Sequence, residues 1–222
     1  MNKNRKIKRG LTTSLAVGMS VMMGAVPVFA AGTSSDADAV YKEETVYVNA
    51  DATGTIDEVT VSNWLKNSGS VSGSLTDAST LKDIKNVKGD ETFTQDGDNL
   101  TWSTDGKDIY YQGKTDKELP VSVSIKYYLD GKEISPKKLV GKSGKVKIRY
   151  EYENHSAVTK TINGKQTTVY TPFTMITAAI LNTDNFSNVK ATNGKVISDG
   201  NKHIVIGVAM PGLAESLKIK NT

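Results

Sequence analysis

The chain has 222 residues, no cysteine and a formal net charge of +4. The lack of cysteine excludes disulfides, structural thiolate zinc sites and thiol nucleophiles. Five positive charges lie within residues 3–9, which leaves residues 31–222 with a formal charge of −1, five below the total. The basic pI therefore belongs to the start of the chain and does not indicate nucleic-acid binding, which needs a clustered basic surface on the folded part.

Residues 1–30 have the layout of a secretory signal peptide. A basic start precedes an uncharged, mostly apolar run from Leu11 to Phe29, and Val28-Phe29-Ala30 places small residues before Ala31. We therefore expect cleavage after Ala30 and export of the remaining chain. The alternative is an uncleaved anchor, for which 19 residues interrupted by two glycines and a proline are marginal. Residues 31–39 are small and polar and predict a flexible spacer.

The rest of the chain predicts an all-β fold of antiparallel, hairpin-rich, sandwich-like modules. Strand-like segments alternate apolar and polar residues, as strands with one buried and one solvated face do. Asp-Gly or Asn-Gly pairs, which favour tight hairpin turns, lie between these segments at residues 96–97, 105–106, 130–131, 163–164, 193–194 and 199–200.

The first predicted β region spans residues 40–115 and ends in a meander. After a polar loop with Gly69 and Gly73, turns DGDN and DGKD separate short apolar segments. Ser79–Lys85 is a weak helix candidate. We expect strands at Thr45–Asn49, Ile56–Leu65, around Phe93, Leu100–Trp102 and Ile109–Tyr111.

The second predicted β region spans residues 116–217 and precedes a tail at 218–222. Val121 to Leu129 and Val146 to Tyr152 alternate clearly, and Pro172 predicts an edge strand or a bulge. Thr177–Leu181 is another weak helix candidate. We expect a hairpin at 121–134 and strands at 145–153, Val169–Ile176, Phe186–Thr192, Lys195–Ser198 and His203–Met210. Whether the two regions share a core is left open.

Gly141-Lys142-Ser143 matches the end of a phosphate-binding loop but lacks its context. The motif needs a glycine five residues earlier, where Pro136 stands, and a helix afterwards. Here Gly144 leads into the alternating run KVKIRYEYE, which predicts a strand without the helix N-terminus that binds phosphate. We interpret Gly141–Gly144 as a turn entering a strand.

Three other chemistries have weak support. His155 and His203 follow turn-like residues, and no G-x-S-x-G motif is present. Asp96–Asn99 offers oxygen ligands, but Lys107 stands where a calcium loop needs glutamate, so a hairpin turn is the better interpretation, with an irregular calcium site as the alternative. Glu151 and Glu153 share the charged face of a strand. We therefore predict no catalytic residue, metal or cofactor site.

Aromatic side chains are the remaining candidates for ligand contact. Trp102 is in phase with Leu100 and predicts a core residue, because large rings dominate small β cores. Trp64 is out of phase with the valines before it, which predicts a bulge. Tyr111 and Tyr128 are assigned to the faces opposite their apolar neighbours, and we select them as exposed residues that contact a ligand.

Long stretches of the chain resemble a known group of surface proteins. These stretches are KELPVSVSIKYYLDGKEISPKKLVGKSGKVKIRYEYEN, DIKNVKGDETFTQDGDNLTWSTDGKDIYYQG, VYTPFTMITAAIL with FSNVKATNGKVISDGNK, and AMPGLAESL. They look like the N-terminal extracellular region of Gram-positive-type surface proteins with x-x-x-Leu-x-x-Gly heptad repeats and a membrane segment, which are related to phage-infection-protein-like membrane proteins. The resemblance covers about Val40 to Leu217 and carries no catalytic motif.

The resemblance and the signal together predict a non-enzymatic, exported cell-surface ectodomain. We expect it to be the N-terminal part of a longer membrane-anchored protein, or else a short secreted version. Membrane attachment would then depend on a C-terminal part missing from this sequence or on an uncleaved signal. The partner is unknown, with cell-wall glycan, a peptide or another surface protein as candidates. The alternatives are a secreted module that binds cell-wall glycan or peptide, and an extracellular hydrolase.

Overall fold

The structure is a computed structural model that describes residues 19–21, 41–67 and 72–219. Its described part is all-β, with five sheets in which every strand pairing is antiparallel. The predicted signal peptide falls outside the described residues except for three, which form β1 (Met19–Val21) on the edge of the first sheet. The predicted spacer at 31–39 and residues 220–222 of the predicted tail also fall outside them.

Two sheets form the N-terminal β region, which comprises residues 41–114 together with β1. Sheet A has the order β1-β2-β3-β8-β5, and sheet B the order β4-β7-β6. Sheet A contains β2 (Tyr41–Ala50), β3 (Ile56–Lys66), β8 (Ile109–Lys114) and β5 (Lys82–Lys88). Sheet B contains β4 (Ser72–Ala78), β7 (Asn99–Asp105) and β6 (Phe93–Asp96).

A compact core joins sheet A to sheet B. Trp102 is fully buried, and its ring lies 4.5 Å from that of Phe93 and 5.3 Å from that of Tyr111, centroid to centroid. This confirms Trp102 as a core residue. Leu65, Leu75, Leu100 and Ile109 complete this buried cluster. A second cluster lies further along sheet A and contains Val46, Val48, Val59 and Val61.

Three sheets form the C-terminal β region, residues 121–209. Sheet C has the order β10-β9-β11, sheet D is the hairpin β12-β13, and sheet E has the order β14-β16-β15. The strands are β9 (Val121–Leu129), β10 (Lys132–Ile134), β11 (Val146–Asn154), β12 (Ala157–Ile162), β13 (Lys165–Tyr170), β14 (Met175–Asn182), β15 (Gly194–Asp199) and β16 (Lys202–Ala209). Two short helices, α1 (Pro136–Leu139) and α2 (Leu213–Leu217), flank them.

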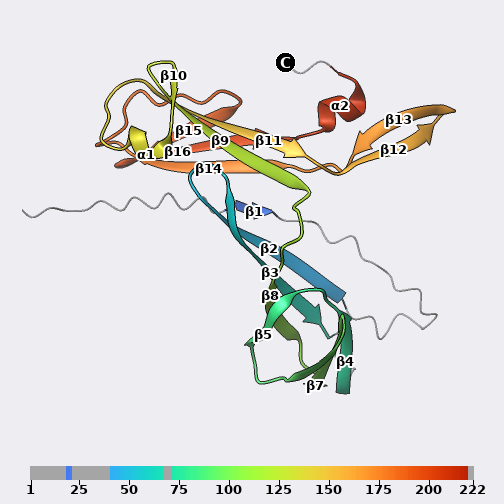
Figure 1. Cartoon of the computed structure of the whole chain (residues 1–222). Coiled ribbons are helices and arrows are strands. Elements are labelled where there is room, and N and C mark those ends of the chain that lie inside the picture. The colour runs from blue at the N-terminus through green and yellow to red at the C-terminus, as the bar shows by residue number, and fades with distance from the viewer. Residues whose placement is uncertain (1–18, 22–40, 68–71, 220–222) are drawn as a thin grey trace, which may run out of the picture.

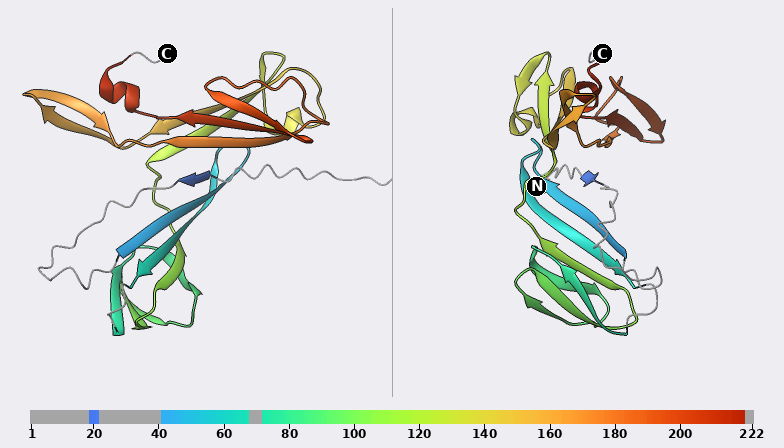
Figure 2. Two further views of the ribbon diagram at one scale, coloured as in Figure 1. Left: turned by 180° about the vertical axis from the view of Figure 1, so that it is seen from behind. Right: turned by 90° about the vertical axis from the view of Figure 1, so that its right-hand side faces the viewer.

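The two regions meet as the stem and the crossbar of a T (Figures 1 and 2). The N-terminal β region is the stem, with β4, β5 and β7 at its far end. The C-terminal β region lies across the opposite end of β2 and β3. Hairpin β12-β13 projects from one end of the crossbar, away from α1 and β10 at the other end.

Several predicted elements are wrong in type or extent. Ser79–Lys85 is not a helix, because β5 covers Lys82–Lys88, and Thr177–Leu181 lies within β14. The predicted strand Phe186–Thr192 is a loop, in which Asn188 has a φ of 54°. The predicted strand Val169–Ile176 is interrupted by residues 171–174, around Pro172, between β13 and β14. The predicted loop after Gly69 contains β4.

Trp64 does not sit at a bulge. It lies in a regular part of the β3–β8 ladder, on the face opposite the core, and its indole stacks on Tyr110 with ring centroids 5.6 Å apart. Its Nε1 donates a hydrogen bond to Asp108 at 2.8 Å. The hydrogen bond and the stacking explain why an out-of-phase tryptophan is stable outside the core.

Candidate interaction site

The most unusual surface among the described residues is one face of sheet E. Cross-strand partners share a face, so the register places residues of β14, β16 and β15 side by side. We call this surface the outer face of sheet E. It consists of Ile176, Ala178, Ile180, Ile197, Ile204, Ile206 and Val208.

The outer face is apolar and open to solvent. Ile176 is 67% exposed and Ile180 65%, and Val208 and Ile197 are also exposed. Contiguous apolar patches larger than a few hundred Å² are rare on monomeric proteins and typically mark interaction sites. This surface is therefore the best candidate for a functional site in the described part of the chain.

The opposite face of sheet E packs towards sheet C, which fixes the orientation of the outer face. Met175 is buried on that inner side, and Thr177 shares a hydrogen bond with the Tyr152 hydroxyl of β11. Val121, Ile125 and Tyr127 form the buried part of sheet C. Because sheet C covers one side only, the isoleucines on the other side of β14 remain exposed.

Polar contacts fasten the hairpin and α2 to these sheets. The side-chain amide of Asn154 donates to the carbonyls of Thr171 and Pro211, each at 2.9 Å, while its oxygen accepts from Ser156. Ser216 in α2 accepts a hydrogen bond from the Tyr170 amide at 3.0 Å. These bonds anchor the base of a hairpin whose β12 is exposed along its whole length.

The β2–β3 turn docks on β9 and joins the two regions. The Thr53 carbonyl accepts a hydrogen bond from the Ile125 amide at 2.8 Å, and the Ala52 carbonyl accepts one from the Tyr127 hydroxyl at 2.7 Å. Asp51 orders the turn by accepting from the Thr53 hydroxyl and from the amides of Thr53 and Thr55. These bonds, led by the one from the Thr53 hydroxyl, lower the pKa of Asp51.

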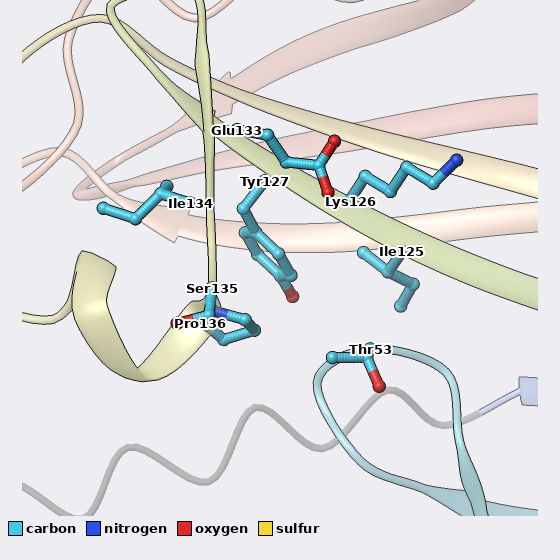
Figure 3. A pocket seen from close by; sticks show the side chains of 8 residues that line it. All are labelled: Thr53, Ile125, Lys126, Tyr127, Glu133, Ile134, Ser135 and Pro136. Atoms are coloured by element: carbon cyan, nitrogen blue, oxygen red, sulfur yellow. The ribbon is translucent and has the colours of Figure 1, made fainter.

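An open hollow of about 360 Å³ lies beside this turn (Figure 3). Figure 3 shows the Glu133 carboxylate and the Lys126 ammonium along one side, the Tyr127 ring in the middle and Pro136 opposite. The hollow is lined by Thr53, Ile125, Lys126, Tyr127, Glu133, Ile134, Ser135 and Pro136. The Tyr127 hydroxyl in this hollow already donates its hydrogen bond to the Ala52 carbonyl, next to Thr53. We therefore assign the hollow to the junction between the two regions.

Tyr111, predicted to be exposed, is fully buried. Alternation along β8 places it on the same face as buried Ile109, two residues earlier, and not on the opposite face. Its hydroxyl donates to Asp77 at 2.5 Å, and Lys42 pairs with the same carboxylate at 2.9 Å. Tyr111 is therefore a core residue whose polar end is satisfied by a partly buried ion pair, and it is not available to a ligand.

This environment predicts alkali sensitivity of the N-terminal β region. Burial, and then the hydrogen bond to Asp77, raise the pKa of the Tyr111 phenol. A raised pKa gives stability that is present below the unfolded-state pKa of about 10 and is lost as the pH rises above it, because unfolding then releases a proton. Urea unfolding followed by tryptophan fluorescence should show a midpoint that falls steeply above about pH 10.

The fluorescence readout is specific, because both tryptophans, Trp64 and Trp102, lie in the N-terminal β region. Tyr111→Phe should flatten the alkaline part of the stability profile. Tyr47→Phe, at a side chain that is 51% exposed, should leave the wild-type profile unchanged. Equal slopes for wild type and Tyr111→Phe above pH 10 would contradict the assignment.

Tyr128 is half-buried on the face of sheet C that points away from the core. The Lys147 ammonium lies 4.9 Å from its ring centroid. Tyr111 lies in sheet A, so the structure does not bring the two predicted ligand-contacting tyrosines together. Tyr128 retains an accessible aromatic surface, and its predicted contact with a ligand stays a prediction.

The turn and face predictions made for other motifs are confirmed. Gly141–Gly144 lies between α1 and the start of β11, and Asp96–Asn99 closes the β6–β7 hairpin. Glu151 lies on the solvated face of sheet C, where it pairs with Lys126 at 2.7 Å and with Arg149 at 2.9 Å. These positions are explained by hairpin geometry and surface ion pairing.

Each histidine contacts a serine. His155 Nε2 lies 2.8 Å from Ser122 Oγ, and His203 Nδ1 lies 2.9 Å from Ser198 Oγ. In residues 41–67 and 72–219, no acidic side chain is hydrogen-bonded to either imidazole. Among these described residues, neither pair has an acidic side chain in the position of the third member of a hydrolase triad.

The described residues hold no cluster of three or more side chains suited to a metal ion. Within the same ranges, no helix is long and apolar enough to span a membrane.

The outer face of sheet E was not predicted, although the sequence contains a signal for it. β14 reads MITAAILN and β16 reads KHIVIGVA, so apolar residues occupy both faces of each strand. In an antiparallel sheet this pattern indicates two buried faces. Only one of them is covered in the described structure.

Comparisons of the chain with protein-family models, with curated proteins and with solved structures find no match.

Proposed function

We propose that the protein is a non-enzymatic, exported ectodomain that acts at the cell surface as a structural or interaction module. In this proposal it forms the N-terminal part of a longer membrane-anchored protein. The observation that carries the interaction role is the outer face of sheet E, where exposed Ile176 and Ile180 lie opposite Val208 and Ile204 of β16. The signal-like residues 1–30 and the resemblance to Gram-positive-type surface proteins support export.

The arrangement of the two regions suits such a module. The β2–β3 turn holds the C-terminal β region through Ile125 and Tyr127, and so presents the outer face from a defined support. Sites on regular strands are held more firmly than sites on loops. A partner would therefore meet a preformed surface.

A second candidate is a secreted module that binds cell-wall glycan or peptide. It is favoured by Tyr128, whose half-buried ring lies beside an ammonium group on the outer side of sheet C. Aromatic rings with one accessible face provide stacking surfaces, and the ammonium could pair with an acidic group of the polymer.

Expression of the 222-residue chain in a Gram-positive host tests the proposal. Mass spectrometry should find that the product begins at Ala31, and protease added to intact cells should digest it. Retention inside the cell with residues 1–30 intact would contradict export. In sedimentation with purified wall material, loss of binding on Tyr128→Ala but not on Tyr47→Ala would favour the second candidate.

A further inference from the structure

We propose that the outer face of sheet E binds the same face of a second copy of this chain. This inference rests on the proposed function, because it names the partner of the surface described above. The argument depends on the size of the face, its shape and the order of its residues.

The size of the face suits a weak dimer. Three strands about 4.8 Å apart, with about seven residue steps of roughly 3.3 Å, give a face on the order of 300 Å² in plan. The side chains make the surface uneven, so its accessible area is larger than this flat area. Two copies would bury on the order of 1,000 Å² in total, near the lower limit for a specific interface. A membrane anchor would hold copies together at the cell surface and raise their effective concentration.

The shape of the face suits another sheet. Its apolar positions are isoleucine, valine and alanine on regular strands. Two such faces can interdigitate as the inner faces of a β-sandwich do, with strand directions within about 30° of each other. A single extended peptide or a helix would leave part of the three-stranded surface exposed.

The residues on this side of the sheet form four rows across the strands. The first row holds Ile176 and Val208. The second row holds Ala178, Ile206 and Lys195, and the third row holds Ile180, Ile204 and Ile197. The fourth row is polar and holds Asn182, Lys202 and Asp199. Apart from Lys195 on edge strand β15, the first three rows are thus apolar, and the face is polar at one end.

This order selects one two-fold arrangement. A two-fold axis perpendicular to the strands would place the apolar first row of one copy against the polar fourth row of the other copy and would bury Lys202. An axis parallel to the strands sets each row against itself, so that β16 faces β16 of the second copy and β14 faces β15. Ile204 then lies opposite Ile204 of the second copy, and Ile180 lies opposite Ile197.

The charged residues remain at the rim in this arrangement. Lys195 lies on edge strand β15, and the Lys202 side chains meet at the polar end, each with Asp199 beside it in the row. No charge is placed at the centre of the interface, where an unpaired charge would be costly.

Cysteine cross-linking tests the arrangement directly, because the chain has no native cysteine. Ile204→Cys in the full chain, expressed with its own N-terminus, should give a covalent dimer with a short bismaleimide. Val87→Cys is the matched control, because Val87 is 49% exposed in the N-terminal β region. It should stay monomeric under the same conditions. Bismaleimide permeates cells, so the result does not depend on export.

A charge substitution tests the same face without cross-linker. Ile180→Lys should weaken self-association at least tenfold in sedimentation between about 1 and 200 µM, while Val87→Lys should behave as wild type. Because Ile180 is 65% exposed, the variant should fold, which circular dichroism would verify. Equal cross-linking of Ile204→Cys and Val87→Cys, or a wild-type chain that is monomeric throughout, would overturn the proposal. The chain could still be exported in that case, so failure of the dimer proposal is distinguishable from failure of the proposed function.

Discussion

Replacing Trp102 with alanine is expected to lower the free energy of unfolding of the N-terminal β region by about 3–5 kcal/mol. Trp102 is completely buried between Phe93 and Tyr111, so truncation removes two ring contacts and leaves a cavity between sheets A and B. Urea unfolding followed by the fluorescence of Trp64, the other tryptophan, measures the loss.

Two further variants make that measurement decisive. Trp102→Phe keeps an aromatic ring and should cost clearly less than the alanine variant. Val87→Ala, at an exposed side chain of the same region, should change the free energy of unfolding by less than about 0.5 kcal/mol. A loss below about 1 kcal/mol for Trp102→Ala would show that the two sheets do not pack through this ring.

Substituting Gly54 with alanine is expected to detach the two β regions from each other. Gly54 has a φ of 90°, and a Cβ there would lie 2.5 Å from the Val123 carbonyl oxygen of β9. The turn must therefore shift, which breaks the hydrogen bonds that Thr53 and Ala52 accept from Ile125 and Tyr127. Backbone strain alone costs about 1–3 kcal/mol, and the clash adds to it.

Hydrogen exchange of the Ile125 amide reports on this junction. We expect exchange at least tenfold faster in Gly54→Ala than in wild type. Gly97→Ala is the matched control, because Gly97 also has positive φ, of 57°, but a Cβ at that position would meet no atom within 4 Å. If both variants leave Ile125 equally protected, the turn does not hold the two regions together.

The local sequence was sufficient to predict a strand and its buried face wherever the other face of that strand is polar. Along β9, Val121, Ile125 and Tyr127 alternate with serines and a lysine, and the structure buries these three apolar side chains. Asp130-Gly131 closes the β9–β10 hairpin with positive φ at both residues, and Gly97 supplies the positive φ in the turn between Asp96 and Asn99. Strand periodicity and turn chemistry depend on neighbouring residues only, and so they can be read from the chain.

Errors arose where local preference competes with pairing between distant segments. Thr177–Leu181 contains good helix formers, yet it is a strand because β14 pairs with β16 over eight residues, from Met175 opposite Ala209 to Asn182 opposite Lys202. The prediction that Tyr111 is exposed is wrong, although Ile109, two residues earlier, lies on the same face of β8. The Asp77 carboxylate that satisfies its hydroxyl is 34 residues away and could not be anticipated.

The sequence by itself determined the β class, the main hairpin turns, the Trp102 core position and the failure of the phosphate-loop motif, because each depends on residues close together in the chain. Only the tertiary structure decided which apolar faces are covered. β14 and β16 are apolar on both sides, and the position of sheet C on one side leaves Ile176 and Ile180 exposed on the other. Burial depends on which sheets pack together, and that is set by contacts between residues far apart in the sequence.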